Sequence, residues 1–312
     1  MPTPELTAVL IAGVCRDRAQ RVLTALGRQS VRDRMEIVVV DIAPEDVPRL
    51  EPATDDVDVH YLSRPDIVRW GTARLEAVRA AQTPIVAFIE DHCFPRTDWA
   101  EHVLTAHEGP WPAVGYAFVN ANPESYSSRA GMLARYGLFT HPVDSGPSRY
   151  VSGNNISYKR EALLAIGDEL ESLLDIDFNL QEELRARGGT LYVEAAAIGA
   201  HQNYARLSGE CQTGRPYCRL LAARRARHWS APRKIFYGLL SPLAAPALRF
   251  LRLAVSLRSR RTLWGPFLAA SPAIVWMYLS DALGESAGYL LGAGDAEAQV
   301  LRWELSTERT TR

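Results

Sequence analysis

The strongest local signal in this chain is the stretch IVAFIEDHCFPRTDW, residues 85–99. It begins as an apolar run and ends abruptly in Glu90, Asp91 and His92. A short run of this kind predicts a buried strand of a parallel sheet. Two carboxylates and an imidazole crowded at a strand end repel one another unless a positive group lies beside them. A divalent cation that carries a diphosphate is one such group, and a polar turn with Asp91 bonded to backbone amides is the alternative.

Three earlier apolar runs predict companion strands over residues 8–14, 36–41 and 57–62. Apolar residues at helical spacing predict helices over 18–28 and 68–81. Repeated strand–helix–strand units imply right-handed crossovers, and ligands then collect at the carboxyl ends of the strands. The first hundred residues therefore predict half of a nucleotide-binding α/β domain.

Prolines interrupt the region after Trp99, so we expect loops and an edge strand over a site there, without long helices. Further along, the pattern predicts a strand over 150–158, a short helix over 160–166, a helix over 178–187 and a strand over 191–198. From residue 215 onward the sequence predicts cationic, apolar helices punctuated by proline.

Charge divides the chain into two kinds of sequence. The 312 residues are 47% hydrophobic, which supports a large core and excludes disorder as the main state. Residues 1–210 hold 20 basic and 30 acidic side chains, whereas residues 211–280 hold 12 basic and no acidic ones. We therefore expect a catalytic domain over 1–210 and a cationic, apolar helical region over 211–312.

The four cysteines are too few and too far apart for metal knuckles or a disulfide framework, so we expect free thiols in a reducing cytoplasm. The first residues lack a basic leader before their apolar run, which predicts that no secretion signal is cleaved. Both features favour a cytoplasmic catalytic body.

The cationic region favours lipid over nucleic acid, because surfaces that track phosphates rarely need so much apolar area. Residues 263–280 carry no charge. As a helix they span about 27 Å, slightly less than the ~30 Å hydrocarbon core, and Pro266 and Pro272 interrupt them. A membrane span, a shallow insertion, a helical hairpin with residues 282–291 and a buried helix of a soluble subdomain all stay open.

Four motifs, in order, resemble the GT-A fold of inverting family 2 glycosyltransferases. They are LTAVLIAGVCRDRAQRVLTALGRQ (6–29), EIVVVD (36–41), GTARLEAVRAA (71–81) and IVAFIEDH (85–92). The resemblance covers about residues 6–205, two thirds of the chain. It implies an α/β/α sandwich that binds a nucleotide sugar, followed here by a C-terminal helical extension.

The same resemblance implies roles at the strand ends. Asp41 is expected to meet the nucleotide base, and Glu90 with Asp91 to face the ribose and the metal-bound diphosphate. Arg74 is expected to support the nucleotide pocket. His92 stands where the family pattern has a carboxylate, and imidazole ligates Mn²⁺ better than Mg²⁺, so the identity of the metal stays open.

The second half of the resemblance supplies the remaining residues. YVSGNNISYKREAL (150–163) is similar to the turn that closes over donor and acceptor, which implicates Gly153, Asn154 and Asn155. LLDIDFNLQEELRARGG (173–189) resembles the motif of the catalytic base, which places Asp177 in that role with Asp175 as the near alternative.

A late histidine, His201, matches one that approaches the metal or diphosphate in the family. The implied metal ligands are therefore Asp91, His92 and His201.

These inferences favour an inverting glycosyltransferase that moves a sugar from a nucleotide sugar to a glycan or lipid-linked acceptor. We expect it at the cytoplasmic face of the cell membrane, attached to lipid through residues 211–292, with Mn²⁺ or Mg²⁺ as cofactor and a role in cell-envelope polysaccharide synthesis. A GT-A-like nucleotidyltransferase is one alternative, although AGVCRDRA (12–19) lacks the glycine-rich, lysine-bearing loop such enzymes use. A non-catalytic GT-A-like membrane scaffold is the other, because His92 departs from the acidic motif.

Overall fold

The computed structural model describes residues 3–52, 58–306 and 309, and its internal contacts divide the chain into two units. The α/β unit comprises residues 1–119 and 141–201, and the helical unit comprises residues 120–140 and 202–312. The single domain expected over 1–210 is therefore not what the structure shows, because residues 120–140 and 202–210 belong to the helical unit. Ala130 and Leu133, from the first of these segments, lie in the core of that unit.

The α/β unit is built on a mixed sheet whose first four strands are parallel. These strands are β1 (Leu6–Ala12), β2 (Met35–Asp41), β3 (Asp58–Ser63) and β4 (Ile85–Ile89), in the order β3-β2-β1-β4. Every residue of β1, β2 and β4 is buried. This explains their continuous apolar sequences, since helices cover both faces of a parallel sheet.

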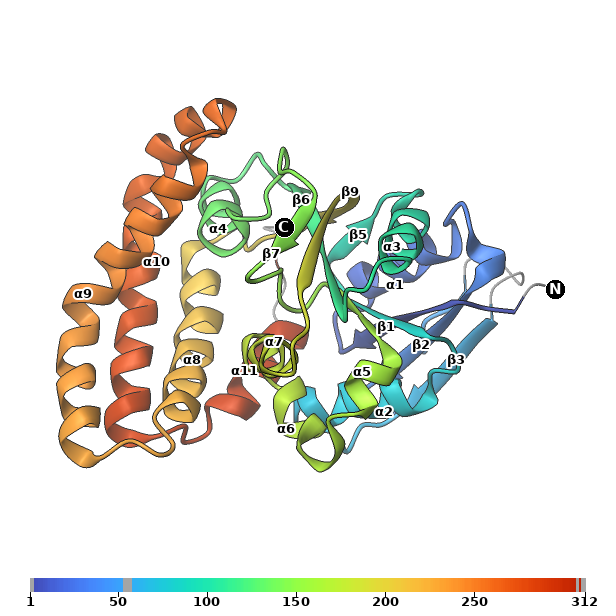
Figure 1. Ribbon diagram of the computed structural model, residues 1–312, viewed down its shortest axis with the longest axis horizontal. Helices are drawn as coiled ribbons and strands as arrows, with labels where there is room; N and C mark the ends of the chain where they lie inside the picture. The colour runs from blue at the N-terminus through green and yellow to red at the C-terminus, as the bar shows by residue number, and fades with distance from the viewer. Residues whose placement is uncertain (1–2, 53–57, 307–308, 310–312) are drawn as a thin grey trace. The chain divides into compact units, whose positions relative to one another are not determined.

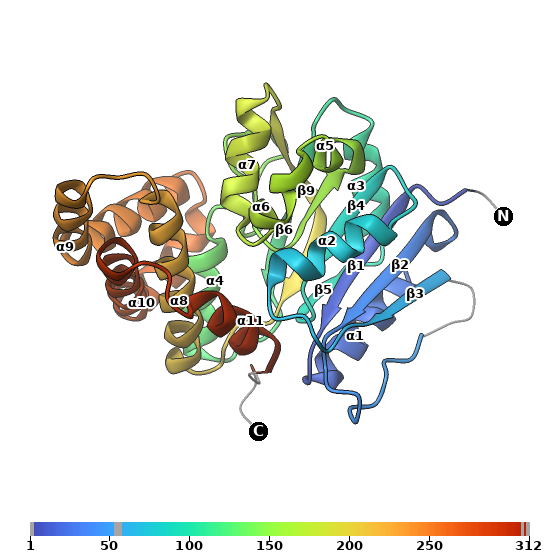
Figure 2. The same ribbon diagram turned by 90° about the horizontal axis from the view of Figure 1, so that it is seen from below.

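Helices α1 (Arg16–Gly27) and α3 (Trp99–His107) lie on one face of this sheet. Helices α2 (Trp70–Ala80), α5 (Arg160–Leu164) and α6 (Leu170–Leu174) lie on the other (Figures 1 and 2). The predicted α/β/α sandwich and its first four strands are confirmed, except that Val57 lies outside the described residues.

The remaining strands run antiparallel to their described partners. They are β5 (Cys93–Pro95), β6 (Ala113–Asn120), β7 (Gly146–Ser148), β8 (Ile156–Lys159) and β9 (Leu191–His201). The sheet continues from β4 through β8, β6 and β9 to β5, with β7 paired to β9. The helix α7 (Asp177–Ala186) precedes β9 and confirms the helix predicted over 178–187.

The expectation of loops and an edge strand after Trp99 is confirmed only in part: the short strand β7 pairs with β9 off the main path of the sheet, but helices and an inner strand also form in this region. Helix α3 begins there, β6 lies inside the sheet between β8 and β9, and an eleven-residue helix, α4 (Tyr126–Tyr136), follows. Three of the prolines fall in connections: Pro110 and Pro112 separate α3 from β6, and Pro123 separates β6 from α4. The predicted strand over 150–158 is likewise limited to β8, because residues 150–155 form a turn.

The helical unit packs α4 with four further helices. They are α8 (Leu207–Arg225), α9 (Ala231–Leu257), α10 (Trp264–Leu291) and α11 (Ala296–Ser306). Its core includes Leu257, Phe267, Ile274 and Met277, from α9 and α10. Helix α10 runs unbroken through Pro272, so the hairpin considered between 263–280 and 282–291 does not form. Pro266 lies in the first turn, where a missing amide breaks no helical bond.

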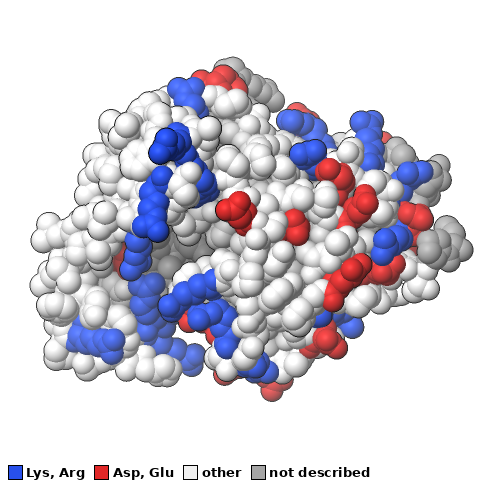
Figure 3. Space-filling view, turned by 45° about the horizontal axis from the view of Figure 1, so that its top comes forward, with Lys and Arg blue, Asp and Glu red and all other residues white. Residues whose placement is uncertain are grey.

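Two segments of the described chain, α9 and Arg261–Leu291, are long and apolar enough to cross a membrane. They differ in burial: 22% of the most apolar window of α9 is buried, against 56% for the other segment. Helix α10 is therefore the central helix of this unit, whereas α9 presents much of its apolar surface outward. The face of the helical unit that is visible on the left of Figure 3 shows few charged side chains apart from a row of basic ones.

Candidate active site

The topology of the parallel strands places the candidate site. Strand β1 pairs with β2 on one side and β4 on the other, so the chain leaves the sheet in opposite directions at this point. Such a switch point opens a crevice at the carboxyl ends of the strands. Asp41 is the last residue of β2, and Glu90 directly follows β4. Both carboxylates therefore lie along the crevice edge.

Asp41 is held by three groups. Arg16, at the start of α1, donates to both carboxylate oxygens at 3.0 and 2.5 Å, and the amide of Ala43 donates at 3.0 Å. The hydroxyl of Tyr61 donates to the same carboxylate, and burial together with this bond raises the pKa of Tyr61. The result is a fixed acceptor beside a phenol ring at the end of β2.

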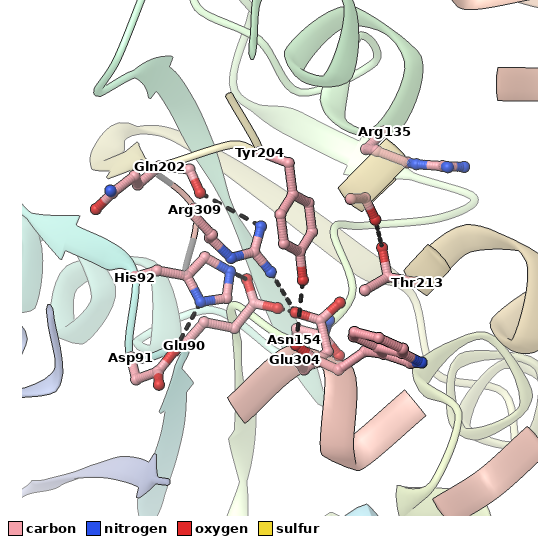
Figure 4. Close-up of polar contacts among 12 residues, drawn as sticks. Glu90, Asp91, His92, Arg135, Asn154, Gln202, Tyr204, Thr213, Glu304 and Arg309 are labelled. Atoms are coloured by element: carbon pink, nitrogen blue, oxygen red, sulfur yellow. Dashed lines mark hydrogen bonds and ion pairs between the residues drawn. The ribbon is translucent and has the colours of Figure 1, made fainter. Parts of the chain in front are cut away.

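Asp91 has an arginine of its own. The Nε and Nη2 atoms of Arg18 each lie 3.0 Å from Oδ2 of Asp91, and both side chains are buried. The other carboxylate oxygen, Oδ1, lies 2.7 Å from Nδ1 of His92 (Figure 4). Arg18 therefore supplies a positive charge that the crowded strand end requires.

Glu90, His92 and His201 form a buried cluster with the chemistry of a metal site. The carboxylate of Glu90 lies 3.5 Å from Nε2 of His92 and 3.3 Å from Nε2 of His201. The two imidazole rings meet edge to face, with centroids 4.9 Å apart. One potential ligand atom from each residue lies within 4.8 Å of the others. This donor set of one oxygen and two nitrogens fits a divalent transition metal. The expected ligand Asp91 is adjacent to the cluster, and Glu90 belongs to it.

The turn predicted to close over the donor meets Glu90 directly. The side-chain amide of Asn154 donates to Oε1 of Glu90 at 2.7 Å, and that of Asn155 donates to Oε2. Asn155 also accepts from the Glu90 backbone amide at 2.9 Å. Asn154 adopts a φ of 63°, a left-handed conformation that asparagine tolerates better than most residues.

Asp177 lies beneath this turn, at the first position of α7. Its carboxylate accepts from the amide of Asn154 at 2.9 Å, from Nη1 of Arg74 at 3.1 Å and from the hydroxyl of Tyr158 at 3.2 Å. Arg74 also donates to the side-chain oxygen of Asn154 at 2.8 Å. A Cβ atom at Gly153 would lie only 3.3 Å from Oδ2 of Asp177, so glycine allows this close approach.

The pKa shifts around Asp177 have electrostatic causes. Burial acts to lower the pKa of Arg74, but the negative charge of Asp177, with smaller contributions from Tyr158 and Glu90, raises it. Burial, and then the charge of Asp177, raises the pKa of Tyr158 well above its ordinary value. Arg74 therefore remains a cation and Tyr158 a neutral donor, and both bond to the carboxylate of Asp177.

Asp175 belongs to a different set of contacts. One of its oxygens accepts from the backbone amide of Gly71 at 2.7 Å, and the other pairs with Arg69 at 2.5 Å. Both partners lie at the amino end of α2, where a carboxylate is favoured by the helix dipole. Asp175 therefore fastens the end of α6 to α2, apart from the cluster of Asp177 and Asn154.

Sequence reasoning missed Arg16, Arg18, Tyr61 and Tyr158. The two arginines had a signal, since GVCRDR places them directly after the first strand, opposite carboxylates that need compensation. Tyr61 lies on β3, whose register brings it beside the end of β2. Tyr158 reaches Asp177 only through the pairing of β8 with β4.

The parallel strands, the covering helices and the polar crevice define a GT-A-type nucleotide-binding sandwich. The chain belongs to glycosyl transferase family 2, whose family model matches residues 9–167. A mannosyltransferase from Pyrobaculum calidifontis, solved in complex with GDP-Man and Mn²⁺, aligns with a TM-score of 0.60 at 16% identity. The alignment covers 93% of this chain and 88% of that one, and it shows the shared fold.

Two curated relatives are validoxylamine A glucosyltransferases from Streptomyces hygroscopicus. The one from subsp. limoneus is 31% identical over an alignment of 134 residues that covers 39% of this chain and 30% of the relative. The one from subsp. jinggangensis is 30% identical over an alignment of 118 residues that covers 34% of this chain and 28% of the relative. The match therefore spans less than a third of the length of either relative.

Proposed function

We propose that the α/β unit transfers a sugar from a nucleotide-sugar donor to an acceptor hydroxyl with inversion at the anomeric carbon. The observation that carries this proposal is a single hydrogen-bonded cluster in a family 2 chain. In it, Glu90 after β4, the turn at Asn154, Arg74 and Asp177 meet at the crevice. Asn154 thus links Glu90, the carboxylate on the donor side, to Asp177, the carboxylate that would face the acceptor.

The donor would lie along the carboxyl ends of β1, β2 and β4. Asp41, fixed by Arg16 and Tyr61, would accept hydrogen bonds from the nucleotide base. A cavity beside Glu90 is lined by residues of β1, α2, β4 and the turn: Val9, Ile11, Trp70, Arg74, Phe88, Ile89, Glu90 and Asn154. The GDP-Man complex of the Pyrobaculum calidifontis relative supports a nucleoside diphosphate sugar as the donor class.

Asp177 would act as the general base. In a single displacement the acceptor oxygen bonds to the anomeric carbon, the bond from that carbon to the diphosphate breaks, and the acceptor proton passes to the carboxylate. Arg74 and the amide of Asn154 hold Oδ2, and Tyr158 donates to Oδ1. A divalent cation held by Glu90, His92 and His201 would neutralise the departing diphosphate.

The helical unit would attach the enzyme to the cytoplasmic face of the membrane. Along α9, Phe236, Leu243 and Leu251 are 60%, 78% and 59% exposed, and they share the face opposite its buried side. Arginines and a lysine cluster near both ends of this helix. Apolar side chains along a helix with cations at its ends favour shallow insertion parallel to an anionic surface. Burial of α10 in the unit argues against a simple span.

Attachment of the chain to a membrane supports a lipid-linked or cell-envelope glycan as acceptor, because such acceptors lie at the surface to which the chain would bind. We assign transfer to the α/β unit and attachment to the helical unit, which includes residues 120–140 and begins again at residue 202.

A panel of nucleotide sugars with Mn²⁺ or Mg²⁺ tests the proposal on the full chain in detergent or lipid. A donor at 100 times its Kd should stabilise the native state by about 2.7 kcal/mol, and transfer of its sugar should follow when an acceptor is added. A nucleotidyltransferase would instead consume a nucleoside triphosphate and release pyrophosphate. A scaffold would bind donor without transfer, or bind none, and either result would refute the proposal.

A further inference from the structure

We infer that Tyr150 and Phe178 form a platform for the acceptor, on which a pyranose ring of a saccharide stacks beside Asp177. The inference rests on the proposed function in one respect, because the role of Asp177 as general base makes this the acceptor side. The observation that carries it is a stacked, partly exposed pair of aromatic rings that adjoins this carboxylate.

The two rings come from segments that both meet Asp177. Phe178 follows Asp177 in the first turn of α7, and Tyr150 lies at the start of the turn whose Asn154 amide bonds to Asp177. The rings are stacked, with their centroids 5.1 Å apart and their planes 24° from parallel. Both side chains are half-buried, so each ring keeps part of its surface open to a ligand.

Gln181 fixes the position of Tyr150 against α7. Its side chain is 2% exposed, and it accepts from the amide of Val151 and donates to the carbonyl of the same residue, each at 3.1 Å. The hydroxyl of Ser148 donates to the carbonyl of Tyr150 at 2.6 Å. The platform is therefore rigid before a ligand arrives, and a rigid aromatic surface loses little conformational entropy on binding.

The groups around the pair match the two kinds of surface that a pyranose ring presents. The faces of such a ring carry C–H groups, which pack against aromatic rings, and its edge carries hydroxyl groups. The guanidinium carbons of Arg149 and Arg185 lie 5.3 and 5.8 Å from the centroid of the Tyr150 ring. Guanidinium groups offer several N–H donors, so they can bond to hydroxyl groups at the edge of a stacked sugar.

A nucleotide base and a lipid chain are the other ligands that pack on aromatic rings. The base of the donor is assigned to Asp41 at the end of β2, whereas the pair belongs to α7 and to the turn before β8. A lipid chain needs a wider apolar surface. Among the described residues 165–201, which include α7, no leucine, isoleucine, valine or aromatic side chain is fully exposed. The pair therefore favours a single sugar ring.

Saturation-transfer difference nuclear magnetic resonance tests this inference on the full chain, in a detergent without sugar head groups. The probes are the methyl glycosides of glucose, galactose, mannose, rhamnose and N-acetylglucosamine. At least one probe should bind and receive saturation through its ring C–H protons. Tyr150→Ala and Phe178→Ala should each weaken that probe by about 10-fold, the equivalent of ~1.4 kcal/mol. Tyr150→Phe, which keeps the ring, should bind it nearly as the wild type does.

Tyr192→Ala is the matched control. Tyr192 stacks on Trp111 with centroids 4.9 Å apart, and both side chains are half-buried. It lies beyond the carboxyl end of α7, whose ten residues span about 15 Å from Asp177 onward. This variant should bind the probe as the wild type does. All the variants should keep their donor affinity, which shows that they are folded and that the pair does not stack the base.

A wild type that binds none of the probes would overturn the inference. Equal losses in Tyr192→Ala and Tyr150→Ala would also overturn it. A probe that binds at the pair in a protein that transfers no sugar would refute the proposed function and leave the platform standing. Sugar transfer with an acceptor KM that is unchanged in Tyr150→Ala and Phe178→Ala would do the reverse.

Discussion

Buried carboxylates occur in both units, but they meet different partners. In the helical unit, Asp281 pairs with Arg135 and lies 3.5 Å from Arg249. Glu285 lies 2.8 Å from Arg249 and 3.1 Å from Arg225. These arginines come from α4, α8 and α9, and the carboxylates come from α10. The network therefore ties the surrounding helices of the unit to its central one.

In the α/β unit, the carboxylates at the crevice contact imidazole and amide groups as well as arginines. Asp91 and Asp177 each contact an arginine, as in the helical unit. Glu90 lies beside two histidines and accepts from two asparagines. A guanidinium donates hydrogen bonds but never offers a lone pair, whereas an imidazole can exchange a proton for a cation. Guanidinium pairs therefore fix the structure, whereas the mixed cluster at Glu90 is suited to bind a ligand.

We expect the largest loss of activity from replacing the proposed general base, Asp177. Asp177→Asn should lower turnover by about 10²- to 10⁴-fold, because the general base is lost, while donor affinity stays nearly intact. Asp175→Asn should lower turnover less, since that carboxylate bonds to Arg69 and Gly71 at the end of α2. Steady-state kinetics with donor titrations would measure both. Equal losses in the two variants would remove the special role of Asp177.

The same kind of substitution at a buried carboxylate of the helical unit, Asp281, should lower the free energy of unfolding. Asp281→Asn leaves Arg135 and Arg249 with one fewer buried carboxylate, and breaking a buried ion pair costs about 3–5 kcal/mol. Chemical denaturation should show this loss, with donor affinity of the folded protein unchanged. An Asp281→Asn variant of full stability that binds donor poorly would contradict a purely structural role for this ion pair.

His107 offers a buried imidazole with a structural role only. Its Nε2 lies 2.8 Å from the hydroxyl of Ser157, and burial, with a smaller effect of Lys159, lowers its pKa to about 3. The folded pKa lies below the unfolded value, so the unfolded chain binds the proton more readily. The contribution of the neutral His107 imidazole to the free energy of unfolding is present above pH 6.5 and is lost as the pH falls toward 3. The loss between pH 6.5 and pH 5 is about 2 kcal/mol.

His107→Gln should flatten that part of the stability profile and leave Mn²⁺ affinity unchanged. Denaturation of both proteins at pH 5 and pH 7 would measure the difference. An identical pH dependence in wild type and variant would show that His107 is not buried as a neutral imidazole.

The smallest effect on stability is expected on the outer face of α9. Leu243→Ser alters a side chain that is 78% exposed, so the free energy of unfolding should change by less than about 0.5 kcal/mol. Combined with Leu251→Ser, it should reduce binding to anionic vesicles, which flotation assays would measure. Ala247→Ser, on the same outward face, is the control. Unchanged vesicle binding in the double variant would exclude this face as the attachment surface.

The sequence was informative where a pattern is local. The strands β1, β2 and β4 follow from continuous apolar runs, and the position of Asp41 and Glu90 follows from the shared carboxyl edge of parallel strands. Residues 18 and 91 are 73 positions apart, and only the packed fold shows that they pair. The contact of Tyr158 with Asp177 is likewise visible only in the folded chain. So is the place of α4, which packs in the helical unit although the segments before and after it in sequence belong to the α/β unit.

The anomeric configuration of a transferred sugar tests directly whether transfer occurs with inversion. The full chain in lipid, supplied with Mn²⁺, a donor identified by binding and an acceptor, should yield a product whose anomeric configuration is opposite to that of the donor. Nuclear magnetic resonance of the product resolves the two configurations, with Asp177→Asn as the control of low activity. A product that retains the donor configuration, or full activity in Asp177→Asn, would contradict a single displacement assisted by this carboxylate.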